Sequence, residues 1–134
     1  SKRKGPPKTE VYEINGPFFF GASYKFMEAM NEIGVKSKVR IIRMRNVLAL
    51  DATGLHTLTS VYKTLKKKGI AFIISDLHTQ ALFAMEKSGL LEEIGEDNVF
   101  GNIDDALNRA REVLGLEKLP RPVPFVPTVA REKV

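Results

Sequence analysis

The chain has 134 residues, of which 43% are hydrophobic, enough for one domain with a single modest core. It holds no cysteine, no signal peptide and no apolar run of the roughly 20 residues that a membrane span needs, so we expect a soluble chain without disulfides or thiolate chemistry. The net charge of +5 is concentrated at the two ends, because residues 10–116 sum to −1. This distribution disfavours a nucleic-acid-binding domain, whose basic residues belong on the fold itself, and fits a segment that flanks a membrane span.

The first elements in the chain are predicted to be a linker and a hairpin. Residues 1–9 are basic and contain adjacent prolines, which favour a linker. Val11–Ile14 alternates apolar and polar residues, as a half-buried strand does. Asn15-Gly16 predicts a tight turn, and Phe18–Phe20 predicts a second strand. We expect these two strands to pair antiparallel.

From Ser23 onward, the apolar residues recur at the spacing of a helix. A first helix is predicted from Ser23 to Gly34, followed by a strand over Val39–Met44. A second helix begins at Asp51 and ends at Gly69. Its apolar residues recur three or four positions apart: Leu55, Leu58, Val61, Tyr62 and Leu65. Lys66, Lys67 and Lys68 fall in its last turn, where cations complement the helix dipole, and we interpret them as a solvated helix end.

The second half of the chain continues the alternation of strands and helices. Ile70–Ser75 is a continuous apolar run, typical of a central parallel strand. Thr79–Ser88 is predicted to be a helix and Val99–Phe100 a short strand. A last helix begins at Asn102 or Asp104 and ends at Gly115. The residues expected on its buried face are Ala106, Leu107, Ala110, Val113 and Leu114.

The order of elements predicts an α/β fold with a mostly parallel sheet and right-handed crossovers. After the last helix, the prolines from Pro120 to Pro127 rule out a helix or a central strand. We therefore expect residues 119–134 to form an extended or disordered tail.

The segment Asp51-Ala52-Thr53-Gly54-Leu55 is the main candidate site. It places a carboxylate, a hydroxyl and a glycine at a helix N-terminus, where backbone N–H groups lack helical partners. Three interpretations remain open: a helix cap worth ~1 kcal/mol, a weak anion or nucleotide site, or a phosphorylation site at Thr53. A phosphate on Thr53 would meet the positive end of the helix but would also lie near the Asp51 carboxylate.

No catalytic constellation is evident. The chain contains no nucleophile elbow, phosphate loop or dinucleotide fingerprint. His56 and Ser60 share a helix face, and they would form a triad only if Asp51 reached them from its cap position. His56 and His78 are the only histidines, without clustered carboxylates around them in the sequence. We therefore expect no enzyme activity, no metal and no cofactor.

Several motifs together carry a family likeness. Residues 11–22, with the sequence VYEINGPFFFGA, resemble the hairpin that opens the STAS domain of SulP-type anion transporters. Residues 47–55, with the sequence VLALDATGL, resemble the loop of that family in which an Asp precedes two small residues and a Gly. Ile73–Leu77 and Met85–Leu90 match the family pattern in the same order. The likeness covers about residues 10–116.

The resemblance implies the STAS fold, a mostly parallel central sheet of about five strands with an N-terminal hairpin and four α-helices. It divides the chain into a linker (1–9), a STAS domain (10–116) and a Pro-rich basic tail (117–134). The implied function is that of the cytoplasmic C-terminal regulatory or interaction domain of a sulfate or other anion transporter, acting in assembly, stability or gating. Such a domain lies at the cytoplasmic face of the plasma membrane, or of the inner membrane in bacteria.

The same resemblance implies the partners. The first is the membrane domain of the same polypeptide, in a parent protein that forms a homodimer. A cytosolic protein, or a weakly bound nucleotide or anion, is a further expected partner, and nucleic acid is not.

The alternative is a stand-alone anti-sigma-factor antagonist or a stressosome-like protein with the same fold. In that branch the resemblance implies phosphorylation of a Ser directly after the loop Asp. Here that position is Ala52, which has no hydroxyl, and Thr53 is the next residue. This departure favours the transporter branch and leaves Thr53 as the phosphorylation site that the alternative requires.

Overall fold

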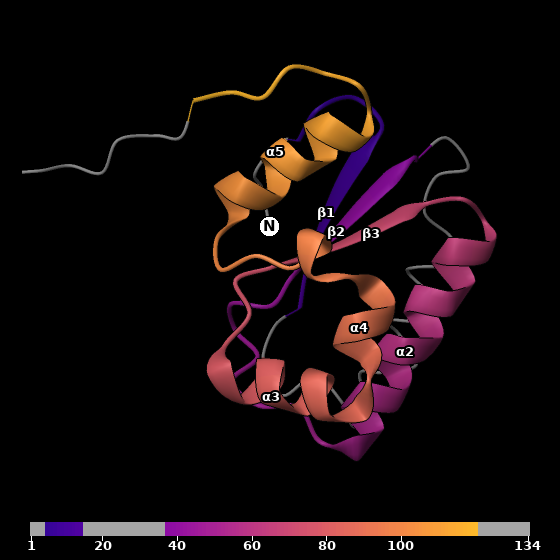
Figure 1. Cartoon of the computed structure of the whole chain (residues 1–134), viewed down its shortest axis with the longest axis vertical. Helices are drawn as coiled ribbons and strands as arrows, with labels where there is room; N and C mark the ends of the chain where they lie inside the picture. Colours follow the sequence, from indigo (N-terminus) through magenta and orange to yellow (C-terminus); the bar gives the residue numbers. More distant parts are fainter. Residues whose placement is uncertain (1–4, 15–36, 121–134) are drawn as a thin grey trace, which may run out of the picture.

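The computed structural model describes residues 5–14 and 37–120 and contains one parallel sheet with helices on both faces (Figure 1). The strands are β1 (Thr9–Glu13), β2 (Val39–Arg43) and β3 (Ala71–Ser75), in the order β1-β2-β3. Thr9 pairs with Val39, and Val39 pairs with Ala71. All three strands therefore begin at one edge of the sheet and end at the opposite edge.

The helices follow the strands along the chain. They are α2 (Ala52–Lys67), α3 (Thr79–Ser88), α4 (Leu90–Ile94) and α5 (Ile103–Val113), with a short 3₁₀ helix, η1, over Glu96–Asn98. In the part of the chain that the structure describes, none of these helices has both the length and the apolar character that a bilayer span requires.

Two hydrophobic cores lie on the two faces of the sheet, because successive side chains of a strand point to opposite faces. Ile42 and Ile74 pack with residues of α2, α3 and α4, whereas Ile41 and Ile73 pack with residues of α5. Tyr62 joins α2 to α4, since its hydroxyl donates to the Glu93 carbonyl at 2.8 Å. This packing fixes the direction of α2 and therefore the place of its two ends.

The predicted α/β class and the parallel sheet are confirmed, and the described residues form three of the roughly five strands expected. The predicted bounds of α3 match those observed. The predicted start of the first strand is wrong, because β1 begins at Thr9 rather than Val11. A turn in which Thr9 N–H donates to the Pro6 carbonyl at 3.1 Å leads directly into the strand. The predicted strand Phe18–Phe20 and the helix from Ser23 to Gly34 lie outside the described residues.

Three other expectations need correction. Val99 forms only a single parallel bridge with Ile74, so Val99–Phe100 is not a full strand. Val113 is 42% exposed, because α5 faces the sheet through Ile103, Ala106 and Ala110. Helix α4 was not predicted, because five residues after the left-handed Gly89 are too few to show a helical period.

Candidate functional site

The predicted site lies where the chain passes from β2 to α2, at the edge where the strands end. The connecting segment is anchored by Val47 and Leu50, which are 2% and 4% exposed. The Leu50 N–H donates to the side-chain carbonyl of Gln80 on α3 at 2.9 Å. These contacts hold Asp51 in place at the start of α2.

Asp51 caps α2, as predicted. Its Oδ1 accepts a hydrogen bond from the Gly54 N–H at 2.8 Å, and its carbonyl accepts from the Leu55 N–H at 2.9 Å. Asp51, Ala52 and Thr53 are exposed, whereas Gly54 is buried and Leu55 is half-buried. The motif therefore has an inner part that builds the helix end and an outer part that faces solvent.

Replacing Asp51 by alanine removes this cap and lowers the free energy of unfolding by about 1 kcal/mol. Asp51→Ser keeps an oxygen that accepts from the first turn and serves as the control, with a loss of less than half that size. Urea denaturation of the two variants measures both values. Equal stability of Asp51→Ala and the wild type would show that the cap contributes nothing.

The solvent-facing part of the motif combines one feature that attracts an anion with one that repels it. In residues 37–120 no backbone carbonyl accepts from the N–H groups of Ala52 or Thr53, which point out of the helix start. The Asp51 carboxylate lies beside them and repels an anion. Anion or nucleotide binding at this corner stays a prediction, as does a phosphate on Thr53, whose side chain is exposed.

The imagined triad is not assembled in the described structure. No hydrogen bond joins Asp51, His56 and Ser60, and Asp51 is engaged with Gly54. The ring Nε2 of His78 lies 2.7 Å from the Arg45 carbonyl, which gives that histidine a structural contact. Within residues 5–14 and 37–120, no three His, Asp or Glu side chains gather in a way that would hold a metal ion.

A polar network that sequence reasoning missed surrounds the same edge of the sheet. Glu13, at the end of β1, accepts two hydrogen bonds from the Arg45 guanidinium, one of them at 3.1 Å, and one from the Asn46 amide at 2.9 Å. The bonds from Arg45 hold the pKa of Glu13 below its ordinary value. The network ties the end of β1 to the segment that carries the candidate site.

A second ion pair lies between the ends of β2 and β3. The Asp76 Oδ2 accepts from the Arg43 Nε at 3.0 Å and from the Ser75 hydroxyl at 2.8 Å. Asp76 has a φ of 58°, a left-handed conformation that Asp tolerates better than most residues. Arg43 is the last residue of β2 and Asp76 directly follows β3, so the pairing of these two strands brings the two side chains together.

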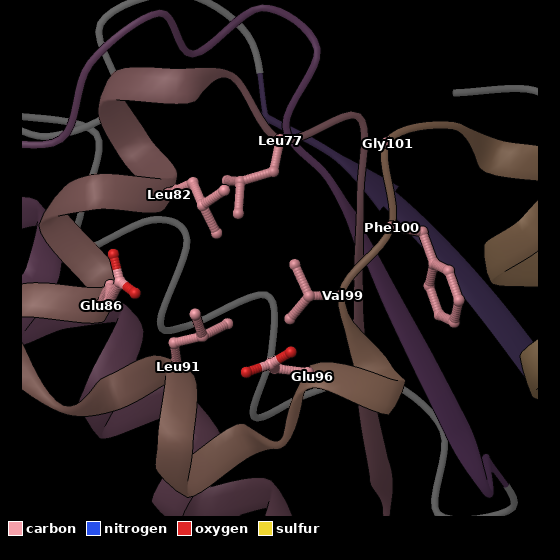
Figure 2. A pocket seen from close by; sticks show the side chains of 8 residues that line it. All are labelled: Leu77, Leu82, Glu86, Leu91, Glu96, Val99, Phe100 and Gly101. Carbon is pink, nitrogen blue, oxygen red and sulfur yellow. The ribbon is translucent and has the colours of Figure 1, made fainter.

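A groove of about 400 Å³ lies between α3, α4 and the segment after η1. Figure 2 shows Leu77, Leu82, Leu91 and Val99 around the hollow, with Glu86 and Glu96 at its margin and Phe100 pointing away. Because its two charged lining residues are carboxylates, this groove does not suit an inorganic anion. A second depression, of about 420 Å³, is lined by Leu55, Gln80 and Phe83 and borders the Asp51–Leu55 loop.

Comparison of the chain with known proteins shows which family it belongs to. The family profile of the STAS domain matches residues 2–106. The chain belongs to the STAS domain family. The resemblance to STAS domains and the α/β fold class predicted from the sequence are thereby confirmed.

Two solved bacterial structures are similar over most of their length. A sulfate transporter family protein from Wolinella succinogenes shares 37% identity with a TM-score of 0.79, covering 85% of this chain and 93% of that one. The STAS domain of a SulP transporter from Vibrio cholerae shares 30% identity with a TM-score of 0.74, covering 84% and 88%. The murine anion transporter Slc26a9 shares the fold, with a TM-score of 0.70 at 20% identity.

Curated relatives are much longer than this STAS domain. The putative sulfate transporter YvdB of Bacillus subtilis is 26% identical over 104 residues, which are 77% of this chain and 20% of that protein. The chain therefore spans about a fifth of the length of that relative.

Proposed function

We propose that this STAS domain is the cytoplasmic regulatory and interaction domain of a SulP-type secondary anion transporter. The main support for the proposal is that the chain covers most of two solved bacterial structures but only a small part of a much longer transporter. The chain covers 93% and 88% of the two solved bacterial structures, but 20% of the Bacillus subtilis putative sulfate transporter. Its partner would be the membrane domain of the same polypeptide, and the parent would be a homodimer at the cytoplasmic face of the plasma or bacterial inner membrane.

We further propose that the Asp51–Leu55 loop is the regulatory surface of the domain. The loop is flanked by two exposed apolar side chains, Leu48 at 71% and Phe83 at 63%. Exposed apolar residues beside a rigid helix end are suited to contact with another protein. A cytosolic partner that binds here would act on assembly, stability or gating of the transporter without any chemical step in the domain.

The stand-alone anti-sigma antagonist is less well supported. The exposed Thr53 would permit a kinase to act, but Ala52 takes the place of the hydroxyl residue that such a switch uses. The relatives described above are transporters or domains of transporters rather than free antagonists.

The proposal is tested by removing residues 9–119 from the parent protein in cells. We expect uptake of labelled sulfate to fall to background, and the amount of parent protein in the membrane separates an assembly defect from a gating defect. A parent with the Glu112→Gln substitution, at an exposed residue of α5 outside the loop, is the control and keeps its uptake. An undiminished amount of parent protein in the membrane, together with undiminished uptake per molecule after removal of the domain, would refute the proposed function.

A further inference from the structure

Five lysines gather at the edge of the sheet where the strands begin. Lys8 and Lys38 immediately precede β1 and β2, and the Lys38 N–H donates to the Lys8 carbonyl at 2.9 Å. The Lys38 carbonyl in turn accepts from the N–H of Ala71, the first residue of β3, at 2.9 Å. Lys66, Lys67 and Lys68 end α2 directly before that strand, at the same edge (Figure 1). We call these five residues the lysine edge.

The lysine edge is solvated and carries no neutralising partner in the described structure. All five side chains are exposed. Within residues 5–14 and 37–120, none of the five forms an ion pair with a carboxylate. Lys66 lies 5.7 Å from the centre of the Tyr62 ring. The dipole of α2 favours cations at its last turn, but it does not account for Lys8 and Lys38, which lie on other elements.

Charge is segregated between the two halves of the domain. Residues 37–75 contain eight Lys and Arg residues against a single acid, Asp51. Residues 76–120, which form α3, α4, η1 and α5, contain ten Asp and Glu residues against four Lys and Arg residues. A net charge near zero thus hides a strong asymmetry, which orients a protein in the field of a charged surface.

Resting on the proposed function, we propose that the lysine edge binds the anionic headgroups of the membrane that holds the parent transporter. Clustered lysines close to a bilayer are attracted to anionic lipids, and the effect is limited to about a Debye length. Helix α2 is about 24 Å long at 1.5 Å per residue. Docking through its C-terminal end therefore holds the Asp51–Leu55 loop away from the lipid, where a cytosolic protein reaches it.

A membrane explains the lysine edge better than nucleic acid does. Surfaces for single-stranded nucleic acids combine basic residues with aromatic side chains that stack on bases. Among the described residues, the only exposed large aromatic is Phe83, which lies on α3 and not on the lysine edge.

The test uses the 134-residue chain and lipid vesicles, in about 0.1 M salt, made of phosphatidylcholine alone or with about one third phosphatidylglycerol. The variant carries Lys67→Gln and Lys68→Gln, and the matched control carries Lys87→Gln and Lys118→Gln, which change the net charge equally. Each lysine near an anionic surface contributes about a fivefold change in partitioning, so we expect the variant to bind anionic vesicles about 25-fold more weakly. The control loses much less, and circular dichroism shows that both are folded.

Three outcomes would overturn the lysine edge as a lipid surface. They are equal binding to neutral and anionic vesicles, an equal loss of vesicle binding in the variant and its control, and a loss of single-stranded DNA binding in the variant with vesicle binding unchanged. Failure of the two proposals is distinguishable. If the substitutions at Lys67 and Lys68 leave vesicle binding unchanged, the lipid surface alone is rejected. If removal of the domain leaves uptake by the parent unchanged, the proposed function alone is rejected.

Discussion

Replacing Asp76 by alanine lowers the free energy of unfolding by about 3 kcal/mol, because it breaks an ion pair that is largely withdrawn from water. The side chains of Arg43 and Asp76 are 14% and 17% exposed, and their atoms lie 3.0 Å apart. Removal of the carboxylate leaves the guanidinium in a poorly hydrated place without this acceptor. It also deprives the Ser75 hydroxyl of the oxygen to which it donates at 2.8 Å.

The conservative variant Asp76→Asn separates the charge from the backbone. Asparagine tolerates the left-handed conformation at φ 58° and still accepts hydrogen bonds, so we expect about half the loss. Urea unfolding followed by circular dichroism measures both variants. If Asp76→Ala stays within about 0.5 kcal/mol of the wild type, the pair does not stabilise the edge of the sheet.

Replacing Glu13 by glutamine lowers the free energy of unfolding at neutral pH by about 2 kcal/mol, since hydrogen bonds to a charged group are stronger than neutral ones. The Glu13 side chain is 5% exposed and accepts from both Arg45 and Asn46. The matched control is Glu112→Gln. Glu112 pairs with Arg109 at 2.9 Å, but its side chain is 49% exposed, so solvent screens the pair and the loss there is much smaller than at Glu13.

The Glu13 contribution also has a defined pH dependence. Its pKa in the folded protein is lowered, chiefly by the Arg45 hydrogen bonds, from the ordinary value of 4.5. The stabilisation is therefore fully present above about pH 4.5 and is lost as the pH falls through the lowered value. The difference in stability between the wild type and Glu13→Gln should shrink over that acidic range. A difference that is constant from pH 7 to acid would show that the Glu13 charge is irrelevant.

Local signals in the sequence were sufficient for the helices that carry caps and clear periods. Asp51 was readable as a cap because the residues that it serves are its immediate neighbours. The ion pairs were not readable, since Arg43 meets Asp76 and Arg45 meets Glu13 across about thirty positions of chain. Such contacts depend on the parallel register of the sheet, which residue spacing along the chain does not reveal.

The distribution of charge over the domain also depends on the sheet topology and cannot be read from spacing along the chain. The sum of −1 over residues 10–116 was used to disfavour a nucleic-acid-binding domain, and the three consecutive lysines were interpreted as a solvated helix end. Only the parallel sheet brings Lys8 and Lys38 to the edge where Lys66–Lys68 end α2. Neither the run of three lysines nor the net charge of the domain reveals the lysine edge, because the sheet topology brings its residues together.

If transport by the parent requires the folded domain, as we propose, Asp76→Ala impairs transport without altering the lysine edge or the Asp51–Leu55 loop. A loss of 3 kcal/mol lowers the melting temperature of the isolated chain by about 12 °C. We expect sulfate uptake by the reconstituted parent carrying Asp76→Ala to fail at a temperature lower by a similar amount, while Asp76→Asn shifts it about half as far. Uptake that continues unchanged through the temperature at which the variant domain unfolds would show that transport does not require the folded domain.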